Sequence, residues 1–167
     1  PQSFVSLPDK KKENFYWAQM YKLASATRIG GGLLDNSGPW QVLTPWPNAW
    51  WNLNVQLSYW SVYASNRLEL GMPLVNAIGS NLKNLISNVP EAYRKDAAAL
   101  PVATDFSLAG EMVNVPGTEK KAQVGNLPWI CHNIWLQYRF SMDETILRDV
   151  LFPTLRRAIN FYLPFLK

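Results

Sequence analysis

The chain has 167 residues, of which 48% are hydrophobic, 13% aromatic and only 17% charged. This balance is enough to bury the core of one domain, and it excludes an intrinsically disordered chain. The formal net charge is +4, and the basic residues are scattered rather than gathered in a stripe with aromatics, so no nucleic-acid partner is expected. No apolar run approaches the length of a membrane span.

The chain has one cysteine and one histidine, which limits its redox and metal chemistry. Cys131 cannot form an internal disulfide, and its apolar neighbours predict a small buried side chain. His132 has no clustered ligands beside it, and the glycines at 30–32 lack the spacing and the lysine of a phosphate loop. We therefore expect no metal and no cofactor. The chain begins with a proline and a polar segment, which indicates a processed or partial polypeptide.

Helical periodicity dominates the first part of the chain. Apolar residues at helical spacing predict a helix over 13–28, ended by the glycines at 30–32. A second helix is predicted over 54–70, with a glycine directly after it. A third begins with a proline in its first turn and covers 73–89. A short helix is predicted over 91–100.

The last part of the chain also reads as helical. A helix opened by Pro128 continues through the apolar residues that follow it. Ser141 with Glu144 three residues later has the pattern of a capping box. Leucines at steps of four predict a final helix, which Pro153 divides or kinks. No strand pattern competes, so the predicted fold class is all-α.

The most unusual stretch is 45–60, which holds four of the eight tryptophans. Within it, Asn52 and Asn54 are two residues apart, a spacing that directs both side chains to one side only in extended chain. If both act on one ligand, the backbone is non-helical as far as about Asn54, which is itself a favoured N-cap residue. The alternative is that Asn54 is only a cap and Asn52 only a turn residue.

The predicted loops, 35–47 and 101–127, flank this helical scaffold, and loops on a rigid scaffold often carry binding groups. Trp50 and Trp51 offer flat faces beside amides, an arrangement that suits a sugar ring and its hydroxyls, and Asp105 lies in the second loop. The alternative for these tryptophans is packing in the core.

Several motifs, in this order, resemble the catalytic domain of glycoside hydrolase family 95, the α-L-fucosidases that release fucose from α-1,2 linkages. Residues 52–60, Asn-Leu-Asn-Val-Gln-Leu-Ser-Tyr-Trp, resemble the family motif Asn-Ile-Asn-Thr-Glu-Met-Asn-Tyr-Trp. Thr104 and Asp105 fall where the family carries His-Asn-Thr-Asp. Residues 129–138 resemble its Trp-Leu-Cys-Gln-His-Leu-Trp-Glu-His-Tyr helix. The segments 21–28 and 147–166 resemble the helices at either end.

The resemblance implies an (α/α)6 barrel. Residues 1–167 would form a single helical region, the N-terminal half of that catalytic domain, with the remainder as its partner. It also implies an inverting exo-glycosidase that acts on terminal sugars and is secreted or periplasmic. Asn52 and Asn54 would be the catalytic, water-orienting pair. The general acid lies in the family beyond the helix that ends near Leu166, so it is expected outside this chain.

The resemblance further implies substrate-binding residues, with departures at some of them. These are Trp50, Trp51, Asp105, His132 and Asn133. Asn133 stands where the family has a histidine, His132 comes one residue earlier, and Leu136 replaces a glutamate. Two alternatives stay open. The chain is a non-catalytic helical carbohydrate-binding or interaction module, or it is a helical scaffold whose aromatics all lie in the core.

Overall fold

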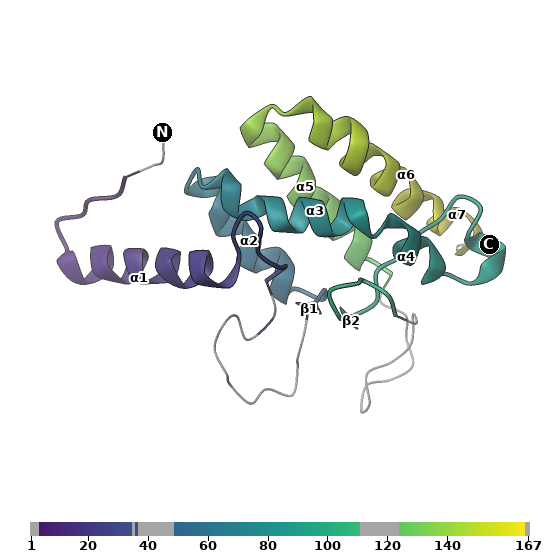
Figure 1. Ribbon diagram of the computed structural model, residues 1–167, viewed down its shortest axis with the longest axis horizontal. Coiled ribbons are helices and arrows are strands. Elements are labelled where there is room, and N and C mark those ends of the chain that lie inside the picture. The colour runs from purple at the N-terminus through teal and green to yellow at the C-terminus, as the bar shows by residue number, and fades with distance from the viewer. Residues whose placement is uncertain (1–3, 35, 37–48, 111–123, 166–167) are drawn as a thin grey trace.

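The computed structural model describes residues 4–34, 36, 49–110 and 124–165. The described parts are mostly helical, and two short strands complete them (Figure 1). The helices are α1 Lys10–Ala26, α2 Asn54–Ala64, α3 Met72–Ser80, α4 Leu82–Ser87, α5 Asn126–Ser141, α6 Phe152–Asn160 and α7 Tyr162–Phe165. Two 3-10 turns cover Leu68–Gly71 and Glu91–Tyr93, a π-helical segment covers Ile146–Leu151, and the strands are β1 Ala49–Trp50 and β2 Ala103–Thr104.

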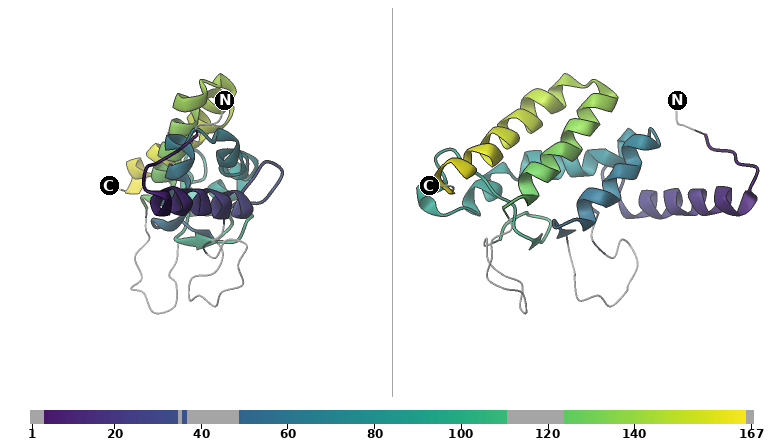
Figure 2. Two further views of the ribbon diagram at one scale, coloured as in Figure 1. Left: turned by 90° about the vertical axis from the view of Figure 1, so that its left-hand side faces the viewer. Right: turned by 180° about the vertical axis from the view of Figure 1, so that it is seen from behind.

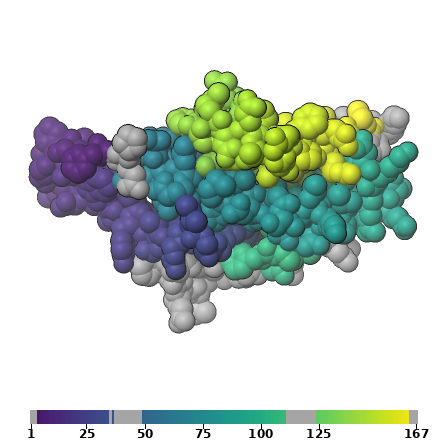
Figure 3. Space-filling view, turned by 45° about the horizontal axis from the view of Figure 1, so that its top comes forward, coloured from purple at the N-terminus to yellow at the C-terminus, as the bar shows by residue number. Residues whose placement is uncertain are grey.

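The helices form a packed body from which α1 extends to one side (Figures 1 and 3). Helices α5 and α6 lie side by side, and the two strands lie at the edge of the body below α2 and α3 (Figure 2). In the segments that the structure covers, no helix combines the length and the apolar character needed to cross a membrane.

Helix α1 begins earlier than predicted because Asp9 caps it. The Asp9 carboxylate accepts hydrogen bonds from the backbone N–H groups of Lys11 and Lys12, at 3.0 and 3.3 Å. These are two of the N–H groups that a helix start leaves without an intrahelical partner. The helix ends at Ala26, and the buried hydroxyl of Thr27 lies 3.0 Å from that of Tyr59 on α2. This contact ties the C-terminal end of α1 to the body.

The core forms where α2, α3 and α5 meet. Its fully buried side chains include Val62 on α2, Ile78 on α3, Ile134 on α5 and Leu151 before α6. Each of these helices presents an apolar stripe at helical spacing, and burying those stripes against one another provides most of the stability of a helical domain. The scaffold therefore holds α2, and with it the turn that precedes α2, in a fixed place.

Two predicted helices are shorter or divided in the structure. The helix predicted over 54–70 ends at Ala64, because Asn66 adopts a left-handed conformation with φ 53° and a 3-10 turn follows. The helix predicted over 73–89 is interrupted at Asn81, whose side-chain amide donates to the Ala77 carbonyl at 2.9 Å and competes with the helix ladder. The prediction that a proline lies in the first turn of α3 is confirmed.

Two further predictions are wrong. Of the helix predicted over 91–100, only the 3-10 turn Glu91–Tyr93 forms. The prediction that the chain has no strands is also wrong, because β1 and β2 pair antiparallel, with Ala49 opposite Thr104 and Trp50 opposite Ala103. Two-residue strands leave no periodicity to detect in a sequence.

The capping box at Ser141 does not form. Ser141 is the last residue of α5, and the Asp143 carboxylate instead accepts from the N–H and hydroxyl of Thr145, at 2.9 and 2.6 Å. The prediction that Pro153 divides the final helix is confirmed, since the π-helical segment gives way to α6 at that proline. Proline has no N–H to donate into the helix ladder, which favours such a change in hydrogen bonding.

Candidate functional site

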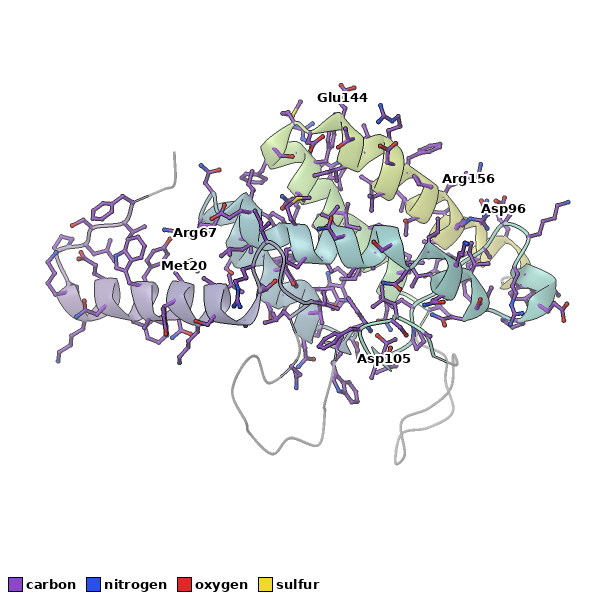
Figure 4. All side chains as sticks on the ribbon, viewed as in Figure 1. Met20, Arg67, Asp96, Asp105, Glu144 and Arg156 are labelled. Atoms are coloured by element: carbon purple, nitrogen blue, oxygen red, sulfur yellow. The ribbon has the colours of Figure 1, made fainter. Side chains whose placement is uncertain are left out.

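The strand pair brings together two segments that the sequence analysis singled out separately. The Trp51 N–H donates to the Val102 carbonyl at 2.7 Å, and the Trp51 indole N–H donates to the Thr104 hydroxyl at 2.8 Å. The asparagine motif therefore begins directly beside Thr104 and Asp105. Figure 4 shows Asp105 at this lower edge of the molecule.

The backbone between β1 and α2 is a turn over residues 51–53, so the predicted non-helical path before Asn54 is confirmed. The helix cap is not Asn54, however. Leu53 occupies the N-cap position with φ 113°, and Asn54 is the first helical residue. Positive φ is strained for a residue with a branched side chain, and it persists only where surrounding contacts hold it. The turn that carries Asn52 is therefore held in place by its neighbours.

The side chain of Gln56 supplies those contacts. Gln56 is fully buried in the first turn of α2. Its Nε2 donates to the Trp51 carbonyl, and its Oε1 accepts from the Leu53 N–H at 3.2 Å. The backbone carbonyl of Gln56 in turn accepts from the Asn133 amide at 2.9 Å. One buried amide thus binds the peptide groups on both sides of Asn52.

Asn52 and Asn54 are both exposed to solvent. Asn54 Nδ2 donates to Asn36 Oδ1 at 2.7 Å, which uses one of its two N–H donors and leaves the amide oxygen available to a ligand. Within the described residues, the Asn52 side chain makes no hydrogen bond. An amide oxygen accepts a hydrogen bond from water, but it cannot take a proton at neutral pH. The pair suits the orientation of a water molecule rather than its deprotonation.

The two tryptophans of this segment differ in position. Trp50 is half-buried on β1, whereas Trp51 is completely buried and belongs to the core. In this structure the Trp51 ring has no face open to a ligand, because its N–H is bonded to Thr104 and its surface is covered. Its observed contacts fix the strand pair, and a direct contact with a sugar stays a prediction.

Asp105 is exposed and its carboxylate is ordered by the next turn. Asp105 Oδ1 accepts from the Ser107 hydroxyl at 2.6 Å and from the Ser107 N–H at 2.9 Å. These hydrogen bonds, the hydroxyl first, hold the pKa of the Asp105 carboxyl below its usual range. The group is therefore ionised at neutral pH, and its second oxygen can accept from a hydroxyl group.

The two predicted residues of α5 point in different directions. Asn133 is completely buried and bonds to α2, so its part in substrate contact stays a prediction and its observed contact is structural. Its Oδ1 has no well-formed hydrogen bond among the described residues. His132 is exposed, and its ring stacks on Trp135 at 5.8 Å and meets Trp60 edge-on at 6.3 Å.

Trp60, His132 and Trp135 form what we call the α2–α5 aromatic surface. Trp60 is 44% exposed and Trp135 is 42% exposed, and the Arg139 guanidinium lies 5.6 Å from the centre of the Trp135 ring. The sequence analysis did not single out the two tryptophans as site residues. The sequence alone does not show that these two tryptophans lie together, because this depends on the packing of α2 on α5.

Glu144, the acidic residue of the predicted capping box, does not join this site. Figure 4 shows Glu144 at the top of the molecule and Asp105 at its lower edge. Glu111, a further acidic residue of the 101–127 loop, lies outside the described residues. Among the residues that the structure describes, no group of three or more histidines, cysteines or carboxylates is placed to hold a metal ion.

Comparison with known proteins identifies the family of the chain. The model of the glycosyl hydrolase family 95 catalytic domain matches residues 10–167. The chain is also 24% identical over 149 residues to alpha-L-fucosidase 2 of Arabidopsis thaliana, an alignment that covers 87% of this chain and 18% of that protein. The family match includes α1, the asparagine turn, the strand pair and the helices that support them. The chain thus belongs to glycosyl hydrolase family 95.

Proposed function

We propose that this chain is part of an inverting exo-glycosidase, α-L-fucosidase-like, which acts on terminal sugars of oligosaccharides or glycans. The observation that carries the proposal is the placement of two exposed asparagines, Asn52 on the turn and Asn54 at the start of α2, close to the strand pair that carries Thr104. Family membership supports the reaction class, and the similarity to a plant α-L-fucosidase supports the sugar.

In an inverting glycosidase, a carboxylic acid protonates the leaving oxygen while a base activates water on the opposite face of the sugar. Here the amide oxygens of Asn52 and Asn54 would accept from that water and aim its lone pair at the anomeric carbon. Because an amide cannot remove the proton, a carboxylate has to complete the base. Asp105, ionised and exposed, would bind a sugar hydroxyl. The general acid would come from sequence outside this chain.

The proposal therefore includes a partner, the remainder of the catalytic domain, which would complete an (α/α)6 barrel. The chain spans 18% of the length of the relative that it matches. The exposed side of α2 and α5 supports this part, since Leu57 is 41% exposed and lies on the same helix as Trp60 of the α2–α5 aromatic surface. Apolar helix faces of this kind are usually covered by further helices.

The test is hydrolysis by the natural polypeptide that contains this chain. The probe is 2'-fucosyllactose, and proton NMR reads the anomer released first. We expect inversion, and we expect Asn52→Ala and Asn54→Ala to lower kcat by about 100-fold or more, the usual effect of removing a positioned polar group from a transition state. Asn76→Ala, an exposed asparagine on α3, is the matched control and should retain activity. Retained activity in both site variants would refute the proposal.

A non-catalytic carbohydrate-binding module is the second candidate, and the α2–α5 aromatic surface favours it. Exposed tryptophan rings can stack on the apolar face of a sugar without any chemistry. Calorimetry of the 19.0 kDa chain with L-fucose and 2'-fucosyllactose separates the two. Binding that is lost in Trp135→Ala but kept in Asn52→Ala, without turnover by the natural polypeptide, would favour the module over the enzyme.

A further inference from the structure

The peptide groups on either side of Asn52 share one buried partner. The Trp51 carbonyl and the Leu53 N–H both bond to the side-chain amide of Gln56. Trp51 is held a second time from the strand side, by Val102 and Thr104. A change in the backbone conformation at Asn52 would therefore break hydrogen bonds made by Trp51 and by Leu53.

We infer that Gln56 is a positioning residue that fixes the backbone at Asn52, and with it the place from which the Asn52 side chain projects. The inference rests on the proposed function, and it deepens it. The amide suits this role because it donates on one side and accepts on the other, as the two peptide groups require. It also offsets the strain of Leu53, whose φ of 113° would otherwise relax. Asn133 holds the backbone of Gln56 from α5, which joins the turn to the core.

The experiment compares Gln56→Met with Gln137→Met. Methionine keeps the length of the side chain and removes both hydrogen bonds. Gln137 is a matched control because it is equally buried, but it lies on α5 and bonds to Leu68 at 2.9 Å, away from the turn. Two quantities are measured in the natural polypeptide that contains this chain, the exchange rate of the Leu53 backbone amide and kcat with KM.

We expect Gln56→Met to speed exchange at Leu53 about fivefold or more, since one hydrogen bond of about 1 kcal/mol is lost. We also expect kcat to fall about 100-fold with KM nearly unchanged, the cost of misplacing a reacting group by about 1 Å. Gln137→Met should change neither. Wild-type kcat in Gln56→Met, or rapid exchange at Leu53 in the unmodified chain, would overturn the inference.

Gln56→Glu keeps the test decisive if the methionine variant does not fold. Glutamate is the residue that the family motif carries at this position. When it is protonated it can donate to the Trp51 carbonyl and still accept from Leu53, whereas the ionised form has no proton to donate. Because burial raises the pKa of a carboxyl, the ratio of variant to wild-type kcat should rise as pH falls from about 7.5 to about 5. A ratio that stays flat with pH would count against positioning by Gln56.

Failure of the proposed function is a separate result. If the unmodified natural polypeptide does not hydrolyse 2'-fucosyllactose, the enzyme assignment falls, and the role of Gln56 is then read from Leu53 exchange alone. Faster exchange in Gln56→Met than in Gln137→Met supports the hold of Gln56 on the turn. Equal exchange rates in the two variants overturn it.

Discussion

The indole N–H of Trp51 and the hydroxyl of Thr104 form a buried hydrogen bond of 2.8 Å that joins the turn after β1 to β2. Thr104 passes the interaction on, because its hydroxyl donates to the Asp105 carbonyl at 2.7 Å. The segment with the asparagine turn and the segment with Asp105 are thus connected through side chains as well as through backbone pairing.

Removal of the Thr104 hydroxyl should destabilise the fold. Thr104→Val keeps the shape of the side chain but leaves the buried Trp51 N–H without an acceptor, which should lower the free energy of unfolding by about 1–3 kcal/mol. Urea denaturation measures this. Trp135→Phe, at an exposed position, is the control and should stay within about 0.5 kcal/mol of the parent. Equal effects of the two changes would mean that the indole bond contributes nothing.

Substitution of Leu53 by glycine should stabilise the fold, although glycine usually lowers stability elsewhere in a helical protein. Leu53→Gly relieves the strain of φ 113°, and we expect the free energy of unfolding to rise by about 1 kcal/mol. Leu57→Gly is the matched control, because Leu57 is a leucine of similar exposure inside α2. There glycine should lower the free energy of unfolding by about 1 kcal/mol. Thermal unfolding measures both variants. If both lose the same amount of stability, the backbone at Leu53 is not strained.

The Asp105 carboxyl should titrate below its usual range because of Ser107. Its pKa is lowered in the folded chain, so its contribution to stability is present above the unfolded pKa of about 3.9 and is lost as pH falls through the folded value. Ser107→Ala should move the titration of Asp105 back towards the usual value, as followed by carbon NMR of the carboxyl. Asp143, which Thr145 holds in the same way, is the internal control and should not move.

Cys131 should be unreactive in the native chain. Burial raises the pKa of its thiol to about 12, so the nucleophilic thiolate is absent at neutral pH. Since the folded pKa exceeds the unfolded value of about 8.5, this contribution to stability is complete below that value and declines as pH rises above it. We expect Ellman's reagent to label Cys131 only at the rate of unfolding. Ser141→Cys adds an exposed thiol as a control and should react at once.

The sequence predicted the helices where apolar residues recur at helical spacing over several turns, as around Ile78 and Ile134. It predicted the helix ends less well, because these depend on the conformation or hydrogen bond of one residue, as at Asp9, Asn66 and Asn81. Such local hydrogen bonds compete with the helix ladder at a free energy of about 1 kcal/mol, too small to read from periodicity.

The candidate site was also predictable only in part. The two-residue spacing predicted a non-helical path through Asn52 if both asparagines act on one ligand. It did not predict that Gln56 holds this path in place. Its role depends on the strained Leu53 and on the strand pair, neither of which leaves a pattern in the sequence. Asn133 shows the limit of a motif, because the resemblance gives its position in the family while only packing shows that its side chain is buried.

The strand pair also has a consequence for the order in which the molecule assembles. Trp51 and Thr104 are 53 residues apart in the chain, whereas only residues 142–151 lie between α5 and α6. Closing the longer loop has the larger entropic cost, so we expect α5 and α6 to pack on one another before β1 meets β2. The strands have two residues each, so we expect local opening to separate them while the helices stay packed. Such an opening would release Asn52 without unfolding the core.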